Sequence, residues 1–286
     1  MKIAFVGDSF CAHAGPGTPA GEDLELGLEL NKKYGVGIRQ DDVIPDDFDQ
    51  YDWPYLVTKH FNAEPTHCGI QGVNFYHSFE MFQRKTRDED YIIFCVTEPF
   101  RMINKYKLPI NTFWIDEIVA QTDRGKLMLE YSVGGPDSLR HGGLTKSQIV
   151  DIVVHARNYG RTMMDEDAAI VMHHALLMYV DNMMVEKGKK CLWFNSFKEF
   201  KHDWMKPFVP RSGPIGNQDL FSITKGRDHN DPSARNHMSK DEQITMSKMV
   251  IDILEHDDLE DGIFVMDKWF PVVRKDSDII DGFIYP

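Results

Sequence analysis

A serine directly after a short apolar run is the first candidate for chemistry in this sequence. Residues 3–6 are apolar and partly β-branched, and Gly7, Asp8, Ser9 and Phe10 follow them. An apolar run that ends at a glycine is typical of a buried strand leading into a turn. Open α/β folds bind their ligands at the carboxyl ends of the strands. We therefore expect Ser9 to be a nucleophile at that edge, with Asp8 and Phe10 beside the substrate.

A histidine near the other end of the chain could act as the general base. His237 ends the segment DPSARNH, which begins at Asp231 and directly precedes a predicted helix. A carboxylate in the same loop can orient a histidine so that it accepts a proton from a serine. Asp231 is the nearest carboxylate, with Asp228 behind it, so we expect Asp231 to orient His237. A Ser-His pair that relies on a backbone carbonyl is the alternative.

Two further segments end predicted strands and could face a developing negative charge. Gly72 follows the second strand, where a glycine lets a backbone N–H approach an oxyanion. Glu98 follows the third strand, at the same edge of the sheet. The expected oxyanion hole therefore comprises the backbone N–H groups of Ser9 and Gly72, with Glu98 beside them. Asn74, two residues after Gly72, is expected to contact the substrate.

The elements that must position these residues alternate along the chain. Short β-like runs are separated by amphipathic stretches, which is the pattern of a parallel sheet with crossover helices. The predicted strands cover residues 3–6, 66–70, 90–96 and 191–194, and helices are predicted at 53–61 and 75–84. Asp52 is the expected N-cap of the first helix, with Pro54 in its first turn.

The middle of the chain is predicted to be mostly helical. Thr145 and Gln148 form a capping box before an amphipathic helix, and a second helix is expected at residues 166–187. Together they indicate a helical insertion at about 101–188. Ser239 and Glu242 form another capping box, which opens a closing helix before a tail that starts at about residue 258. The whole chain, 1–286, is predicted to be a single domain.

Taken together, the four blocks of candidate residues resemble the SGNH (GDSL-type) serine hydrolase family. That family has its nucleophile in a GDS motif after the first strand, a glycine and an asparagine in the oxyanion hole, and a DxxH motif before the last helix. The resemblance covers residues 2–101 and 191–255, and the GDSF opening is similar to members encoded by tailed bacteriophages. It implies a three-layer α/β/α, flavodoxin-like fold with a central parallel sheet.

Two departures from the family pattern affect the expected chemistry. Glu98 stands where the family has a donating asparagine, and an ionised carboxylate would repel an oxyanion. A protonated Glu98, or the amide of Asn74 or Asn195, could take the donor role, or activity could be weak. Ala234 occupies the position of the family's acid, three residues before the histidine, so Asp231 must reach from six residues away.

Composition limits the classes of partner. The 286 residues include 32 Lys and Arg against 45 Asp and Glu, a net charge of −13 that opposes binding to nucleic acid or anionic lipid. The most apolar stretch, 168–185, is interrupted by His173, His174 and Asp181 and is predicted to be a buried helix rather than a membrane span. No signal peptide is expected, and the four separated cysteines indicate a reducing, cytoplasmic compartment.

The expected function is therefore that of a serine esterase. The resemblance favours a short acyl group such as O-acetyl, carried on a small molecule or a carbohydrate, with no cofactor. No metal site is expected, because His173 and His174 are adjacent on a helix and should point to different sides. A homo-oligomer or an association with a virion is compatible with the resemblance. The alternative is an inactive module that keeps the fold for binding or for virion assembly.

Overall fold

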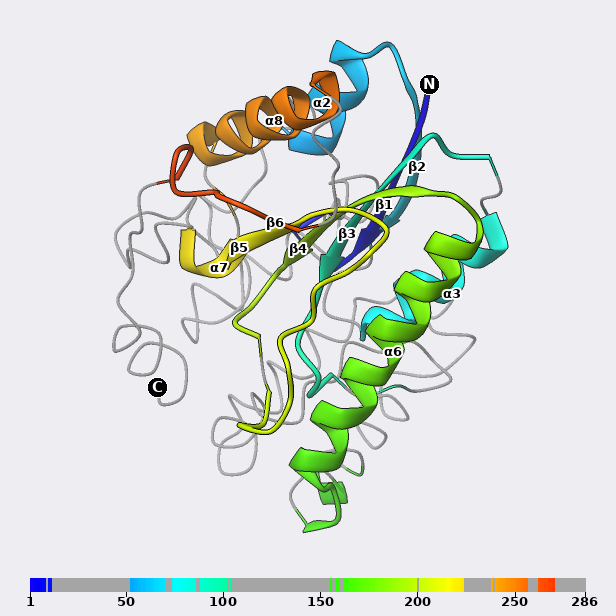
Figure 1. Ribbon diagram of the computed structural model, residues 1–286, viewed down its shortest axis with the longest axis vertical. Helices are drawn as coiled ribbons and strands as arrows, with labels where there is room; N and C mark the ends of the chain where they lie inside the picture. Colours follow the sequence, from blue (N-terminus) through cyan, green and yellow to red (C-terminus); the bar gives the residue numbers. More distant parts are fainter. Residues whose placement is uncertain are drawn as a thin grey trace, which may run out of the picture.

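The computed structural model in Figure 1 describes most of the elements predicted above. It describes residues 1–8, 10–11, 52–69, 74–85, 88–101, 103, 155, 158–159, 162–199, 201–223, 238, 240–256 and 262–270. The capping residues Thr145, Gln148 and Ser239 lie outside these residues, and of the helix predicted to begin near Thr145 only 155 and 158–159 are described, all three of them helical.

A six-stranded parallel sheet forms the centre of the fold. Its strands are β1 (Lys2–Gly7), β2 (Glu64–Gly69), β3 (Tyr91–Val96), β4 (Lys190–Asn195), β5 (Ile215–Asp219) and β6 (Ile263–Phe264). They lie in the order β2-β1-β3-β4-β5-β6, and every neighbouring pair is parallel. The prediction of an α/β fold with a central parallel sheet is confirmed.

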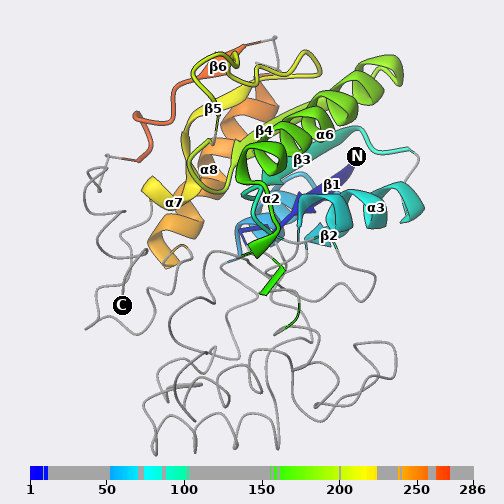
Figure 2. The same ribbon diagram turned by 90° about the horizontal axis from the view of Figure 1, so that it is seen from below.

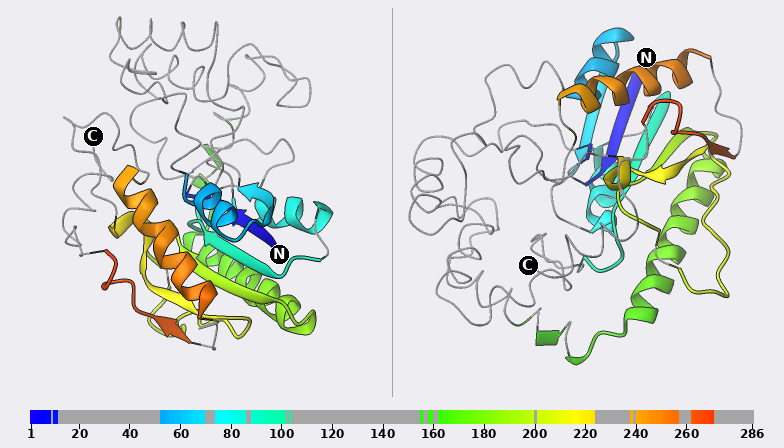
Figure 3. Two further views of the ribbon diagram at one scale, coloured as in Figure 1. Left: turned by 90° about the horizontal axis from the view of Figure 1, so that it is seen from above. Right: turned by 90° about the vertical axis from the view of Figure 1, so that its left-hand side faces the viewer.

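Helices cover both faces of the sheet, which explains the continuous apolar runs of its central strands. Ile3 and Phe5 of β1 face a core shared with α2 (Trp53–His60) and α8 (Lys240–Glu255). Ala4 and Val6 face the opposite core, shared with α3 (Phe75–Lys85) and α6 (Glu166–Glu186). Figures 2 and 3 show the sheet between these two layers of helices, with α2 and α8 side by side.

The strands that the sequence did not predict lie at one edge of the sheet. β5 has the sequence IGNQD and is followed directly by the short helix α7 (Leu220–Ile223). β6 lies in the segment predicted as a tail and pairs with β5. A polar strand and a two-residue strand lack the apolar run that marks β1, β3 and β4, so no sequence pattern distinguished them from loops.

The start of α2 differs from the expected cap. Asp52 occupies the N-cap position, but its side chain makes no capping hydrogen bond. The backbone N–H of Trp53 instead donates to Oε1 of Gln243 on α8, at 3.1 Å. The predicted N-cap position of Asp52 is confirmed, but the side-chain hydrogen bond expected of it is not formed, and a side chain from a neighbouring helix accepts from the first N–H of the helix.

The prediction that 168–185 forms a buried helix is only partly right. α6 begins after Asp165, whose Oδ1 accepts a hydrogen bond from the backbone of Ala168 at 3.1 Å. Its inner side buries Leu177, Val180 and Met184, whereas the outer side exposes a set of large apolar residues: Val171, Met172, Met178, Tyr179 and Val185. Within the described residues α6 is the one helix long and apolar enough to cross a membrane, judged by length and composition. A helix that packs on the outside of a sheet buries one face and exposes the opposite one. The composition of α6 did not show that apolar residues also occupy its exposed face.

One polar residue of α6 has a clear structural role. The buried carboxylate of Asp181 accepts hydrogen bonds from the backbone N–H groups of Arg211 and Ser212, at 2.9 to 3.0 Å. It thereby fixes the segment that leads from β4 back to the start of β5. This tether explains why a carboxylate interrupts an otherwise apolar helix.

Gly7 ends β1 at a position with no room for a side chain. Its φ is +158°, and a Cβ there would lie 2.1 Å from the carbonyl oxygen of Cys95 on β3. We predict that Gly7→Ala lowers the free energy of unfolding by about 3 kcal/mol or more, because backbone must move. Gly188→Ala is the control: its φ is +60° in open space, so the expected loss is about 1 kcal/mol. Equal losses in urea unfolding would contradict this packing.

Candidate functional site

The structure describes half of the predicted site. Asp8, Phe10, Asn74 and Glu98 are described, and all lie at or just beyond the carboxyl ends of β1, β2 and β3. The other candidates fall outside the described residues: Ser9, Gly72, Asp228, Asp231, Ala234 and His237. The contacts of the residues beside them are described.

Asp8 anchors the turn after β1. It is fully buried, and its Oδ1 accepts hydrogen bonds from the backbone N–H of Phe10 at 3.0 Å and from Oγ of Ser196 at 2.9 Å. The first bond is the local turn that a short carboxylate makes with the backbone two residues on. The second joins the turn to the end of β4. Asp8 was expected beside a substrate, whereas these bonds give it an anchoring role for the residues on either side of Ser9.

A relay of hydrogen bonds connects this turn to the start of α8. The indole Nε1 of Trp53 donates to the backbone carbonyl of Phe10 at 2.7 Å, while its backbone N–H donates to Gln243. Gln243 lies in the first turn of α8, the helix that follows His237 in the sequence. Met238, the neighbour of His237, is buried in the same apolar cluster as Phe10. The residues next to Ser9 and next to His237 are therefore held by one cluster.

Both polar atoms of the Asn74 side-chain amide make hydrogen bonds within the protein. Its Oδ1 accepts from the backbone N–H of Tyr76 at 2.9 Å, at the start of α3, and its Nδ2 donates to the carbonyl of Arg101 at 2.5 Å. The side chain is buried. These bonds tie α3 to the segment after β3, so they make Asn74 an anchor; its contact with substrate stays a prediction.

Glu98 is paired with an arginine that the sequence analysis missed. Its Oε1 accepts a hydrogen bond from Nε of Arg101 at 3.1 Å, and the two side chains are only 6% and 9% exposed. The Arg101 guanidinium lies 5.2 Å from the centre of the Phe197 ring. The Phe197 ring packs edge-on against the Phe10 ring, with 5.8 Å between the two ring centres. The expected repulsion by Glu98 must be reconsidered, because Arg101 compensates its charge.

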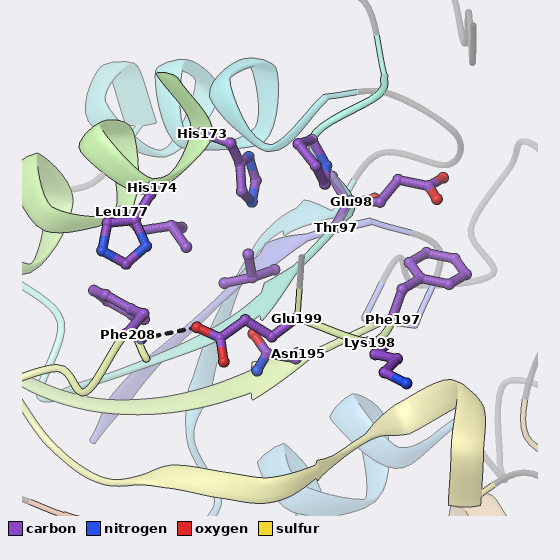
Figure 4. A pocket seen from close by; sticks show the side chains of 12 residues that line it. Thr97, Glu98, His173, His174, Leu177, Asn195, Phe197, Lys198, Glu199 and Phe208 are labelled. Carbon is purple, nitrogen blue, oxygen red and sulfur yellow. Dashed lines mark hydrogen bonds between the residues drawn. The ribbon is translucent and has the colours of Figure 1, made fainter. Parts of the chain in front are cut away.

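A small pocket lies beside this pair, between the end of the sheet and α6 (Figure 4). His173, His174 and Leu177 line it from α6, Thr97 from the end of β3, and Asn195 from the end of β4. Its volume is about 20 Å³. Both histidines border this pocket, and Figure 4 shows their rings extending from α6 in different directions. No group of three metal-ligating side chains occurs among the residues that the structure describes.

The ring of His173 is neutral at physiological pH. Its pKa is lowered to about 4, mainly by burial and to a smaller extent by His174, while a hydrogen bond with the backbone of Thr97 opposes this shift. Its Nδ1 is buried, although part of the residue reaches the surface. A neutral imidazole has one nitrogen that accepts a hydrogen bond, so His173 presents an acceptor here.

A wider cleft continues from the small pocket toward β5. The two share Asn195, Lys198, Glu199 and Phe208, and the cleft holds about 350 Å³. Asp219 borders it at the end of β5 and accepts hydrogen bonds from the backbone N–H and the hydroxyl of Ser222, both at 2.7 Å. Burial raises the pKa of its carboxyl group. The carboxyl edge of β3 to β5 is thus hollowed and lined by polar side chains.

A cysteine two residues after Ser9 is unsuited to act as a nucleophile. Cys11 is fully buried, and burial raises the pKa of its thiol well above the ordinary value, with a hydrogen bond to Cys95 and nearby carboxylates adding to the effect. The thiolate is the reactive form of cysteine, so this thiol is inert. The hydroxyl of Ser9 remains the candidate nucleophile of this turn.

The fold and the site define an α/β protein with polar side chains gathered at the carboxyl edge of a parallel sheet. No protein-family model, no curated protein and no solved structure matches the chain. Its function must therefore be argued from the site itself.

The buried pair of Glu98 and Arg101 yields a stability prediction. Glu98→Gln should lower the free energy of unfolding by about 3 to 5 kcal/mol, because it leaves the guanidinium uncompensated in a buried position. The control is Glu80→Gln, which removes the partner of the exposed Arg84 on α3 and should cost about 0.5 kcal/mol or less. Urea unfolding of both variants at neutral pH measures the difference. Similar small losses in both would mean that the Glu98 pair is not buried as described.

Proposed function

We propose that this chain is a serine esterase of the SGNH type that hydrolyses short acyl esters, with a carbohydrate or another small alcohol as the leaving group. Ser9 is the nucleophile, His237 the general base and Asp231 the acid that orients it. The backbone N–H groups of Ser9 and Gly72 form the oxyanion hole. The domain is single, requires no cofactor, and works in the cytoplasm, which is that of the host cell if a phage encodes the chain.

One observation carries this proposal: the relay from Phe10 through Trp53 to Gln243. A nucleophile and its base must come within hydrogen-bonding reach, although they lie 228 positions apart in the sequence (237 − 9). The relay fixes the residue after Ser9 against the first turn of the helix that follows His237. Met238 and Phe10, the sequence neighbours of the two candidate residues, share one apolar cluster.

The strand order supports the finer assignment of the fold. The order β2-β1-β3-β4-β5 corresponds to the flavodoxin-like order of doubly wound sheets, in which ligands bind where the strand order reverses, next to β1. In the sequence, Ser9 stands two residues after the end of β1. Helices on both faces agree with a three-layer α/β/α arrangement of the SGNH type.

The proposed reaction has two steps. Ser9 Oγ attacks the ester carbonyl while His237 takes its proton, and the tetrahedral intermediate collapses as His237 returns that proton to the leaving alcohol. A water then attacks the acyl-serine with His237 again as base, which releases the acid and restores Ser9. Asp8 holds the turn in place through its bonds to Phe10 and Ser196.

A second candidate function is binding or virion assembly without catalysis. It is favoured by the pairing of Glu98 with Arg101 at the position where the family presents a donating amide. A homo-oligomer or a contact with other virion proteins would then be the functional state. The two candidates differ in whether Ser9 reacts with acylating reagents.

The proposal predicts selective labelling of one serine. A fluorophosphonate should modify Ser9 in the folded protein, and p-nitrophenyl acetate should be hydrolysed at a rate that Ser9→Ala lowers by at least about 10³-fold. Mass spectrometry of peptides locates the label. Urea-unfolded protein serves as the control, because a serine without an oriented base should stay unlabelled. If folded protein resists the reagent while a known serine esterase reacts, the binding module becomes the better account.

A further inference from the structure

The outward side of α6 carries an apolar stripe along most of the helix. Figure 2 shows α6 at the periphery of the described elements. The side chains of Met172, Met178 and Tyr179 are 68%, 51% and 58% exposed. All members of the stripe are exposed: Ala168, Val171, Met172, Ala175, Met178, Tyr179 and Val185. Large exposed apolar patches on folded proteins mark interaction surfaces, so we expect a partner to cover this one.

The spacing of the stripe is that of a helix that packs against another helix. Its central line advances by alternating steps of three and four residues through Ala168, Val171, Ala175, Met178, Asn182 and Val185. This is the a/d repeat of coiled coils, in which side chains of one helix fit between those of the facing helix. Asn182 is the one polar member, and its side-chain oxygen already accepts a hydrogen bond from Arg211.

Opposite charges stand at the two ends of α6. Three acidic residues lie at its start and three lysines follow its end: Asp165, Glu166 and Asp167, and then Lys187, Lys189 and Lys190. Two α6 helices that pack antiparallel bring the acidic end of each beside the basic end of the other. A parallel pair would bring like charges together. The charges therefore favour a second copy of α6 in the antiparallel direction.

A two-fold axis at the middle of α6 matches the stripe with itself. A closed homodimer has such an axis, and its interface uses the same surface of both copies. With the axis between Ala175 and Met178, Met178 packs on Ala175 of the second copy. The same register pairs Val185 with Ala168 and Lys187 with Glu166. Larger apolar side chains thus meet alanines, and opposite charges meet at both ends.

A lipid bilayer fits this face less well than a second helix does. The inner side of α6 is buried in the core of the sheet, and Asp181 holds the segment before β5, so the helix cannot leave the sheet to span a membrane. Helices that lie on a membrane surface are rich in Lys and Arg on their polar face. Between Glu166 and Glu186, α6 has neither.

We propose that the outer stripe of α6 is a homodimer interface, in which the α6 helices of two copies pack antiparallel about a two-fold axis near Ala175 and Met178. The inference is independent of the proposed esterase function, because the stripe lies on the side of α6 that faces away from the sheet.

Sedimentation equilibrium of the full chain tests the interface. At about 1 to 100 μM the wild type should have twice the mass of one chain. Met178→Glu should raise the dissociation constant by about 100-fold or more, because it places two carboxylates near the axis in an apolar contact. Val265→Glu is the control: Val265 is 49% exposed but follows β6, so this variant should stay dimeric. If Met178→Glu does not fold, Ala175→Arg takes its place with the same expected loss.

Charge reversal tests the antiparallel register. Glu166→Lys and Lys187→Glu should each raise the dissociation constant by about fivefold or more, and the double variant should return it to within about twofold of the wild type. Both residues lie on one helix, about 32 Å apart for 21 residues at 1.5 Å each, so rescue can arise only between copies. Additive losses in the double variant would overturn this register.

Cross-linking tests the direction of the two helices. The four native cysteines are buried, so a new surface cysteine is the reactive one. A short bismaleimide should join two copies of Ala175→Cys, about 10 Å apart, but not of Ala168→Cys, about 26 Å apart along the axis. Equal cross-linking of both variants is the result of a parallel pair and would overturn the proposal.

The remaining outcomes identify a different cover for the stripe. A wild-type monomer at about 100 μM would overturn the proposal, as would a dimer that Met178→Glu leaves intact. A monomer that sediments with phosphatidylcholine vesicles, and loses that binding in Met178→Glu, would assign the stripe to a membrane surface. A monomer whose Ala175→Cys variant resists maleimide would mean that another segment of the same chain covers it.

Discussion

The buried carboxylate of Asp8 is the contact on which this edge of the sheet depends. A carboxylate with no exposure to water is costly unless it is hydrogen-bonded, and Oδ1 of Asp8 accepts hydrogen bonds from the backbone of Phe10 and the hydroxyl of Ser196. The first bond shapes the turn after β1, and the second joins that turn to β4, two strands away in the sheet. A turn held at two points is a rigid support for a reactive side chain.

The neighbouring interactions extend from this anchor in two directions. Toward α2 and α8, the indole of Trp53 holds the carbonyl of Phe10 and so connects the turn to the helix that follows the loop of His237. Toward β3, the Phe10 ring contacts Phe197, which supports the guanidinium of Arg101 and with it the buried Glu98. The charge of Glu98 is thus kept in a buried pair, and Glu98 also borders the small pocket beside it, together with Lys198 and Glu199.

Much of the sheet could be predicted from the sequence, because β1, β3 and β4 are buried on both faces and appear as continuous apolar runs. β5 could not, since Asn217 and Gln218 replace such a run at a position near the edge of the sheet. In the site, Asp8 and Glu98 were found because they lie within two residues of the end of a strand. Arg101 and Ser196 were not, and His173 was considered only as a metal ligand, because their contacts arise where segments distant in the sequence meet. His173 in particular depends on the fit of α6 against the end of β3, which no local pattern encodes.

The central claim is that the anchored turn and the start of α8 bring Ser9 and His237 together. An experimental structure of the full chain that resolves both side chains measures this directly, as the distance from Ser9 Oγ to the nearer ring nitrogen of His237. Our account predicts a separation of about 2.6 to 3.2 Å, the reach of a nucleophile and its base, or slightly more without substrate. A separation of more than about 6 Å, too long for a bridge through one water, would contradict it.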